Sequence, residues 1–260
     1  MKLCDKRLFL LDMDGTIYLS ETLFDGSAEF LDTVKRKGGR YVFLTNNSSR
    51  GTDAYIEKMH RLGIETSDAD FFTSADAAVM TLDRSALYYV CGTGSLKGQL
   101  LRAGFRLSEK PSDDVDTVLL GYDTELTYQK LEDCCILLMR GAGYIATHPD
   151  LVCPTWYGSA PDCGSVIEML FTCTGRRPTR IIGKPQPDMA LAAMKKFGCT
   201  PEETCLVGDR VYTDIACGVN AGIDTVFVLS GEGVPSDCGK YGVRPTYTMR
   251  SIRELLDNIR

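Results

Sequence analysis

Residues 8–20, LFLLDMDGTIYLS, hold the feature from which the rest of the chain is interpreted. An apolar run, which predicts a buried strand, ends in Asp12-Met13-Asp14-Gly15-Thr16. The two carboxylates stand one residue apart, where like charges repel, and burying either without a partner is costly. A cation or a chemical reaction is therefore expected at this point of the chain.

The rest of the chain alternates short apolar runs with helical patterns, which is typical of βαβ units and a parallel sheet. We predict an α/β fold whose core is a Rossmann-like, doubly wound parallel sheet, with a smaller α/β domain inserted. The expected core is residues 1–80 and 180–260, and the expected insert is 81–179. Strands are predicted at residues 7–14, 40–49, 85–92, 115–123, 144–150, 179–185, 204–209 and 224–231, and helices at 27–39, 52–64, 127–143 and 187–198.

Composition is that of an ordinary globular enzyme, with 260 residues, 44% hydrophobic and 25% charged. A net charge of -6 without a Lys/Arg cluster argues against nucleic acid as a partner. No apolar run reaches the roughly 18 to 20 residues of a membrane span, and the amino terminus is too charged for a signal peptide. We therefore expect neither a nucleic-acid nor a membrane partner.

The eleven cysteines are scattered and include no C-x-x-C pair. This pattern argues against zinc and favours reduced thiols in a cytoplasmic protein. Most of these cysteines are expected to be small core residues.

Polar groups follow four predicted strands. In an open α/β sheet, ligands collect beyond the carboxyl ends of the strands, so we expect these groups to converge. Carboxylates can hold Mg²⁺ through oxygen, and the metal and a lysine together neutralise a phosphate. The groups are Asp12/Asp14, Thr45-Asn46-Asn47, Gly183-Lys184-Pro185, and Gly208-Asp209 with Asp214.

Four segments, DMDGT, LTNNSS, GKPQPDM and GDRVYTDI, resemble in order and spacing the four motifs of the haloacid dehalogenase (HAD) superfamily of phosphatases. The resemblance covers nearly the whole chain. The gap between the second and third motifs has room for a type-2 cap domain. Within that gap, GYDTELTYQKL and ATHPDLVCPTWYGSAPDCGS resemble the NagD-like, p-nitrophenylphosphatase-type subfamily.

The resemblance implies that Asp12 is the nucleophile and is converted to an aspartyl-phosphate. It implies that Asp14 protonates the leaving alcohol and then activates water. The metal ligands it implies are Asp12, Asp209 and the backbone carbonyl of Asp14. Asp214 would be an acid that orients metal-bound water or Lys184.

The resemblance also implies the phosphate site. Thr45 and Lys184 would bind the transferring phosphoryl group, with Asn46 as a further donor. Gly15 would let the chain turn closely around the phosphate and offer its backbone N–H.

In the expected cap, His148 and Asp162 are candidate substrate-specificity residues. Many relatives carry Asn at the first position, and Asp162 adds a negative charge where the cap approaches the substrate. The chain is expected to hydrolyse a small phosphate ester such as a sugar phosphate, a nucleoside monophosphate or p-nitrophenyl phosphate. It is also a candidate homo-oligomer.

Three alternatives stay open. A phospho-acceptor signalling domain also uses Asp, Mg²⁺, Thr and Lys, but is far shorter and carries its acceptor on a middle strand. A non-enzymatic binding protein on the same fold is disfavoured because every catalytic position is filled. A phosphotransferase or phosphomutase is disfavoured by the large cap and the lack of an obvious bisphosphate site.

Overall fold

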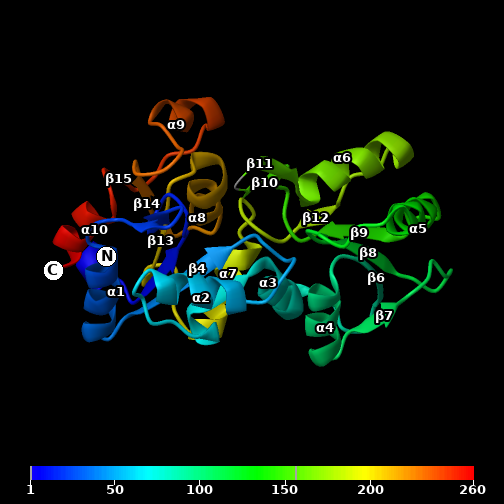
Figure 1. The fold of residues 1–260 in the computed structure, drawn as a ribbon, viewed down its shortest axis with the longest axis horizontal. Coiled ribbons are helices and arrows are strands. Elements are labelled where there is room, and N and C mark those ends of the chain that lie inside the picture. Colours follow the sequence, from blue (N-terminus) through cyan, green and yellow to red (C-terminus); the bar gives the residue numbers. More distant parts are fainter. Residues whose placement is uncertain (1, 156) are drawn as a thin grey trace. The chain divides into compact units, whose positions relative to one another are not determined.

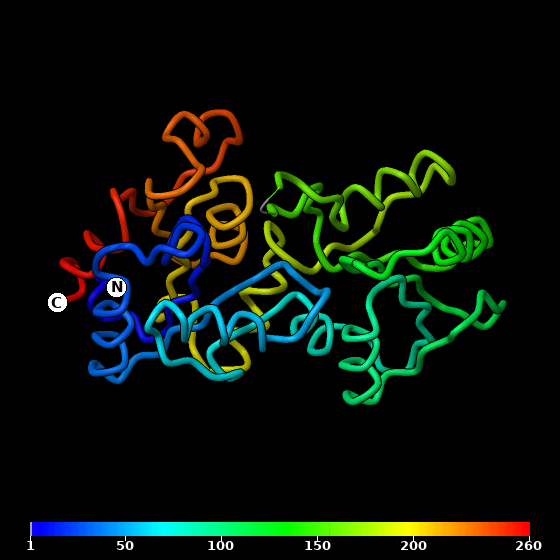
Figure 2. The backbone as a smooth tube through the Cα atoms, viewed as in Figure 1, coloured from blue at the N-terminus to red at the C-terminus, as the bar shows by residue number. Residues whose placement is uncertain are grey.

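A computed structural model describes residues 2–155 and 157–260, which form two compact units. Unit 1 holds the chain up to Thr45, then Thr52–Phe72 and Lys184–Arg260; unit 2 holds Asn46–Gly51 and Thr73–Gly183. Figure 1 labels the elements of each unit where there is room. The chain passes between the units after residues 45, 51, 72 and 183, and its path can be followed along the tube in Figure 2.

Unit 1 is built on a six-stranded sheet in the order β15-β14-β13-β1-β4-β5. The pairings that join β15, β14, β13, β1 and β4 are parallel. A short antiparallel pair, β2 and β3, follows β1. The strands are β1 (Leu8–Leu11), β2 (Tyr18–Leu19), β3 (Thr22–Leu23), β4 (Arg40–Thr45), β5 (Phe71–Thr73), β13 (Thr204–Gly208), β14 (Asp224–Val228) and β15 (Tyr247–Met249). The helices are α1 (Ser27–Arg36), α2 (Asp53–Arg61), α7 (Asp188–Phe197), α8 (Ala216–Asn220), α9 (Ser236–Tyr241) and α10 (Ile252–Ile259), with short helical turns at Leu3–Asp5, Asp68–Asp70 and Val211–Ile215.

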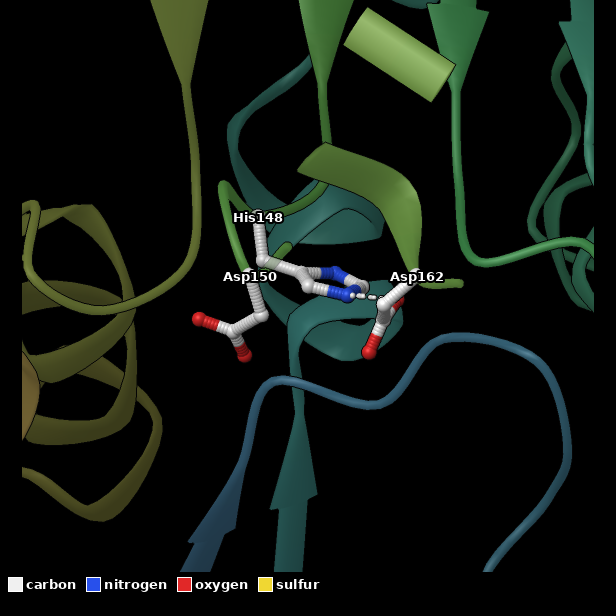
Figure 3. A group of neighbouring side chains, drawn as sticks. All are labelled: His148, Asp150 and Asp162. Atoms are coloured by element: carbon white, nitrogen blue, oxygen red, sulfur yellow. Dashed lines mark hydrogen bonds and ion pairs between the residues drawn. The ribbon is translucent and has the colours of Figure 1, made fainter. Parts of the chain in front are cut away.

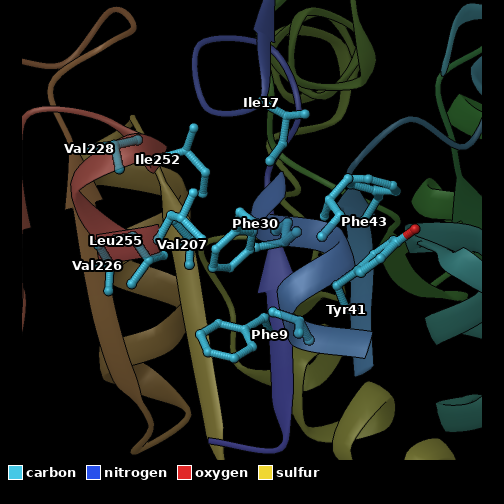
Figure 4. Packing of buried hydrophobic residues seen from close by; sticks show 14 of the residues in the cluster. Phe9, Ile17, Phe30, Tyr41, Phe43, Val207, Val226, Val228, Ile252 and Leu255 are labelled. Atoms are coloured by element: carbon cyan, nitrogen blue, oxygen red, sulfur yellow. The ribbon is translucent and has the colours of Figure 1, made fainter. Parts of the chain in front are cut away.

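The core of unit 1 lies where α1 and α10 pack against the sheet (Figure 4). All four residues of β1 are buried, as expected for a central strand of a parallel sheet. Phe9 of β1 meets Phe30 of α1 edge-to-face, with ring centroids 5.3 Å apart. Truncating a buried Phe of this kind to Ala costs about 3–5 kcal/mol. Packing therefore holds β1, and the acids that follow it, in a rigid position.

Unit 2 has its own five-stranded parallel sheet in the order β12-β9-β8-β6-β7. An antiparallel hairpin, β10–β11, stands apart from that sheet. Thr127 caps α5 by accepting from the Lys130 N–H at 3.3 Å, at the start of the helix predicted over 127–143. The strands are β6 (Leu87–Cys91), β7 (Arg106–Ser108), β8 (Thr117–Leu120), β9 (Gly143–Ala146), β10 (Val152–Thr155), β11 (Gly158–Pro161) and β12 (Arg180–Ile181), and the helices are α3 (Ser74–Thr81), α4 (Gly94–Arg102), α5 (Tyr128–Met139) and α6 (Cys163–Thr174).

The predicted α/β class with a Rossmann-like parallel core is confirmed. One strand is placed differently from the prediction. The predicted strand at 179–185 shortens to β12, which pairs with β9 and so belongs to the sheet of unit 2. Lys184 therefore does not follow a strand of the core sheet, and three strand ends of that sheet carry polar groups rather than four.

The borders of the units, the cysteines and the helices can each be compared with what the sequence predicts. The predicted domain borders at 80/81 and 179/180 lie near the transitions at 72/73 and 183/184, and Asn46–Gly51 is an extra piece of unit 2. All eleven cysteines are free thiols. Across residues 2–155 and 157–260, every helix is too short or too polar to cross a lipid bilayer.

Candidate active site

Three neighbouring strands of unit 1 end at one edge of the sheet and carry polar residues there. β1 lies between β4 and β13, with Leu11 in register with Phe43 on one side and Val207 on the other. Because all three strands are parallel, Thr45 at the end of β4, Asp12 after β1 and Asp209 after β13 reach the same edge.

Lys184 is the cation of this site. Its Nζ donates to Asp12 Oδ1 at 2.7 Å, to Asp214 Oδ1 at 2.6 Å and to the Leu44 carbonyl at 3.3 Å. Burial alone would lower the pKa of this ammonium, but the two carboxylates outweigh it and hold the pKa above its usual range. Lys184 is therefore charged and fixed between two acids.

Asp214 is placed by an irregular turn rather than by the start of a helix. It lies in the π-type turn Val211–Ile215, where its Oδ2 accepts from the Arg210 N–H at 3.2 Å. The helix that follows, α8, begins at Ala216, so Asp214 is not its N-cap. The Oδ1 of this carboxylate instead accepts a hydrogen bond from Lys184 Nζ.

Asp12, Asp209 and Asp214 form a group of acids. They offer ligand oxygens that all lie within 4.8 Å of one another. Burial, and then the neighbouring carboxylate of Asp214, raises the pKa of Asp12 to about 6. Burial, with the charges of Asp12 and Asp214, raises the pKa of Asp209 to about 7. Both pKa values stay raised although Lys184 and Arg210 lie nearby, so the group is short of positive charge.

Asp209 has the atom that a metal would take. Its Oδ2 accepts from the Glu232 N–H at 2.8 Å, whereas its buried Oδ1 has no hydrogen-bond partner among the described residues. A buried oxygen of this kind calls for an explanation such as an ion. Oxygen donors alone suit Mg²⁺, so the residues present fit that metal.

Asp14 stands apart from this group. Its side chain is exposed, and its carboxylate is not among the described oxygens that converge with Asp12. The carboxylate is thus open to solvent while Asp12, two residues earlier, is only 16% exposed.

Gly15 is needed at its position because of its backbone conformation and the space around it. Its φ is +83°, and a Cβ on it would lie 2.4 Å from Asp209 Oδ2. Its N–H donates to the Tyr18 carbonyl at 2.7 Å, and its expected role as a phosphate donor stays a prediction. Gly15 lets the backbone pass close to the carboxylate of Asp209.

Thr45 and Asn46 are consecutive in sequence but belong to different units. The Thr45 hydroxyl lies 3.4 Å from that of Tyr55 in unit 1. The Asn46 amide donates to Asp150 Oδ2 at 3.0 Å in unit 2. The expected role of Asn46 in phosphate binding stays a prediction.

His148 and Asp162 lie together inside unit 2 (Figure 3). The imidazole is fully buried, with Nδ1 2.9 Å from Thr147 Oγ1 and Nε2 2.9 Å from Asp162 Oδ1. The Asp150 carboxylate, although near, is turned away from the ring nitrogens in Figure 3. Both ring nitrogens are therefore engaged within the unit, and substrate contact by this pair stays a prediction.

Arg210 and Glu232 belong to the site of unit 1 although they were not anticipated. Arg210 Nε lies 3.4 Å from Glu232 Oε2, and the Glu232 N–H holds Asp209. The charges of Asp12, Asp214 and Asp209 keep the pKa of the Arg210 guanidinium above its usual range against the effect of burial. Because Arg210 directly follows Asp209 in the sequence, its place in the site could have been predicted. No local sequence pattern indicates Glu232.

Comparisons with known proteins match the chain to a family of hydrolases. Residues 9–106 match the profile of a haloacid dehalogenase-like hydrolase family, and residues 181–255 that of a HAD-hydrolase-like family. An acid sugar phosphatase of Staphylococcus aureus is 32% identical over 253 residues, 96% of each chain.

Two solved structures are similar over nearly the whole chain. A 4-nitrophenylphosphatase from Thermotoga maritima is 40% identical, with a TM-score of 0.89 and 99% of each chain covered. A glycerol phosphate phosphatase from Mycobacterium tuberculosis, in complex with magnesium, is 29% identical with a TM-score of 0.88. That match covers 98% of this chain and 78% of the other.

Proposed function

The chain belongs to the haloacid dehalogenase-like hydrolases and is a phosphatase, and from that premise we propose that it hydrolyses a small phosphate monoester, with Mg²⁺, through an aspartyl-phosphate on Asp12. The observation that carries this proposal is the pairing of Asp12 with Lys184 beside Asp209 Oδ1, which has no hydrogen-bond partner in the described part of the chain. A nucleophile, a cation for phosphate and a metal-binding oxygen thereby meet at the end of one rigid strand.

Asp12 attacks the phosphorus in line, and the bond to the leaving alcohol breaks. Lys184 holds one oxygen of Asp12, so that the second oxygen is directed to the substrate. Lys184 and the Thr45 hydroxyl bind the transferring phosphoryl oxygens, with Asn46 as a further donor. The nearby positive charge favours the ionised form of Asp12 that attack requires.

Asp14 moves the protons. In the first step it protonates the leaving alcohol, and in the second it takes a proton from the water that attacks the aspartyl-phosphate. Its exposed carboxylate supports this role, because the group must reach both an alcohol and a water.

Asp12 and Asp209 would hold Mg²⁺ through their carboxylates, and Asp14 would do so through its backbone carbonyl. Asp214 orients Lys184 rather than binding metal directly. When bound, the metal would neutralise charge on the phosphate. Gly15 keeps the backbone close to Asp209, where any side chain would collide.

Unit 2 is proposed to be the type-2 cap that selects the substrate, with residues 81–179 as its main part and 1–80 and 180–260 as the catalytic core. Candidate substrates are sugar phosphates, nucleoside monophosphates and p-nitrophenyl phosphate. The names of the relatives, which include acid sugar phosphatase and 4-nitrophenylphosphatase, support this range. A cytoplasmic location, supported by the eleven free thiols, and a homo-oligomeric state are further proposals.

A screen of phosphate release over sugar phosphates, nucleotides and p-nitrophenyl phosphate, with and without Mg²⁺, tests the proposal. Asp12→Asn serves as the inactive control. Steady, Mg²⁺-dependent turnover of a monoester is expected. A single stoichiometric phosphorylation would instead support a phospho-acceptor domain. Transfer of phosphate to a second molecule without its release would support a phosphomutase. Failure to react with any substrate would support a binding protein.

A further inference from the structure

The segment Asn46–Gly51 interrupts unit 1 in sequence but is bonded to unit 2. The Ser74 hydroxyl donates to the Asn46 carbonyl, and the Thr93 hydroxyl donates to the Ser49 carbonyl at 2.8 Å. Together with the bond from Asn46 to Asp150, these contacts hold both the main chain and a side chain of the segment. The residue that precedes the segment is Thr45, one of the two proposed phosphoryl-binding residues.

A buried row of polar groups continues from this segment into unit 2. Ser48 Oγ accepts from the Tyr122 N–H at 2.9 Å and lies 3.0 Å from Thr147 Oγ1. Thr147 Oγ1 lies 2.9 Å from Nδ1 of His148, whose Nε2 lies 2.9 Å from Asp162 Oδ1.

One arrangement of hydrogens satisfies every member of the row. Ser48 donates to Thr147, Thr147 donates to His148 Nδ1, and His148 Nε2–H donates to Asp162. Asp162 is fixed in turn, because its side chain accepts from the Cys163 N–H at the start of α6. His148 therefore accepts the Thr147 hydroxyl hydrogen, which leaves the Thr147 oxygen to accept from Ser48.

The Thr147 main chain also binds Gly183, the last residue of unit 2 before the chain returns to unit 1. The Gly183 N–H donates to the Thr147 carbonyl at 2.7 Å. A Cβ on Gly183 would lie 2.5 Å from Asn46 Oδ1 and 2.7 Å from that same carbonyl. Asn46 and Gly183 are therefore neighbours in unit 2, although they are 137 positions apart (183 minus 46).

Thr45 directly precedes Asn46 in the sequence, and Lys184 directly follows Gly183. We propose that Thr147, oriented by His148 and Asp162, is a positioning residue of the phosphatase reaction. Its hydroxyl holds the segment 46–51 and its carbonyl holds Gly183, so it fixes the points from which Thr45 and Lys184 extend, each through one peptide bond. This inference rests on the proposed function, and it gives His148 and Asp162 a role that requires no contact with substrate.

The test compares Thr147→Val, which keeps the shape but removes the hydroxyl, with Thr147→Ser, which restores it. Thr172→Val, the same change at an exposed position on α6, is the matched control. With p-nitrophenyl phosphate and Mg²⁺, Thr147→Val is expected to lower kcat by about tenfold or more, because displacements of about 1 Å cost up to about 100-fold. The Mg²⁺ concentration at half-maximal rate should stay unchanged, and Thr147→Ser and Thr172→Val should keep wild-type kcat.

A second measurement does not depend on turnover. Inorganic phosphate, added with Mg²⁺, should raise the Tm of the wild type and of Thr172→Val more than that of Thr147→Val. Ser48→Ala removes the hydroxyl that donates to Thr147 and should behave as Thr147→Val does. It replaces Thr147→Val in the test if Thr147→Val does not fold.

The inference is overturned if Thr147→Val and Ser48→Ala keep both wild-type kcat and the wild-type response to phosphate. It is equally overturned if they lose Mg²⁺ affinity in parallel, since that indicates general damage. A wild type that releases no phosphate from any ester would instead refute the proposed function, and the response to phosphate would still test the inference.

Discussion

Lys184 Nζ lies 2.7 Å from Asp12 Oδ1, although the two residues are 172 positions apart in sequence. The same ammonium also binds Asp214 at 2.6 Å, so that one positive charge serves two buried carboxylates. Asp209, the third acid of the group, has the Arg210 guanidinium nearby, and its pKa is still raised to about 7. This imbalance of charge underlies the predictions for the site.

Replacing the lysine should destabilise the protein in a pH-dependent way. Lys184→Met leaves Asp12 and Asp214 without their cation, and breaking a buried pair of this kind costs about 3–5 kcal/mol. The loss should be largest at pH 8, above the raised pKa of Asp12 of about 6, and smaller at pH 5, where protonation of Asp12 relieves it. Urea unfolding of the metal-free protein at the two pH values checks this. An equal loss at both would contradict it.

Asp12→Asn should abolish turnover while the fold stays intact. An amide is a poor nucleophile, and loss of a nucleophile in a hydrolase lowers kcat by orders of magnitude, here at least about 1,000-fold. Phosphate release and thermal unfolding are the measurements. Asp25→Asn, an exposed acid of unit 1, is the matched control and should keep full activity. Substantial residual turnover in Asp12→Asn would rule Asp12 out as the nucleophile.

Asp14→Asn should separate chemistry from metal binding. Removing a general acid–base lowers kcat by about 100-fold to 10,000-fold. The carboxylate of Asp14 lies outside the group formed by Asp12, Asp209 and Asp214, so Mg²⁺ affinity should be retained. Mg²⁺ titration followed by calorimetry measures that affinity. A large drop would mean that the Asp14 carboxylate is itself a ligand.

The metal-free protein should become less stable as the pH rises. The pKa values of Asp12 and Asp209 are raised from 3.8 to about 6 and about 7. Between about pH 4 and 7 the folded state holds protons that the unfolded chain has lost, so the free energy of unfolding falls with pH.

Mg²⁺ should reverse this trend, because it binds the ionised carboxylates. The rise in Tm on adding MgCl₂ is therefore expected to be larger at pH 8 than at pH 5. Thermal denaturation with and without the metal measures both effects. A larger metal effect at pH 5 would count against the proposed ligands.

Gly15→Ala should lower both the affinity for Mg²⁺ and the stability of the fold. The new Cβ would lie 2.4 Å from Asp209 Oδ2, whereas one at Gly38 would meet no described heavy atom within 4 Å. Both glycines have positive φ, +83° and +76°, so each change carries a backbone cost of about 1–2 kcal/mol. Only Gly15→Ala should also lower Mg²⁺ affinity, by about tenfold or more given the direct clash with a ligand. Equal Mg²⁺ affinity in the two variants would refute this role of Gly15.

Much of unit 1 could be predicted because local patterns specify it. The apolar run before Asp12 forms β1, and the helix expected near 187–198 is α7, which ends at Gly198. The strand at 179–185 was placed in the wrong sheet, because its apolar pattern is the same whether it pairs with a core strand or with β9. Pairing partners of parallel strands are set by long-range contacts that periodicity does not carry.

The sequence by itself determined the α/β class, the family and the acids, because apolar periodicity and four ordered motifs are local properties of the chain. Only the tertiary structure decided that the Gly15 N–H is taken by Tyr18 and that the buried Asp209 Oδ1 lacks a described partner. It also decided that Asn46 and Gly183 meet beside Thr147. Each of these depends on which distant groups share a buried space, where every donor and acceptor must find a partner.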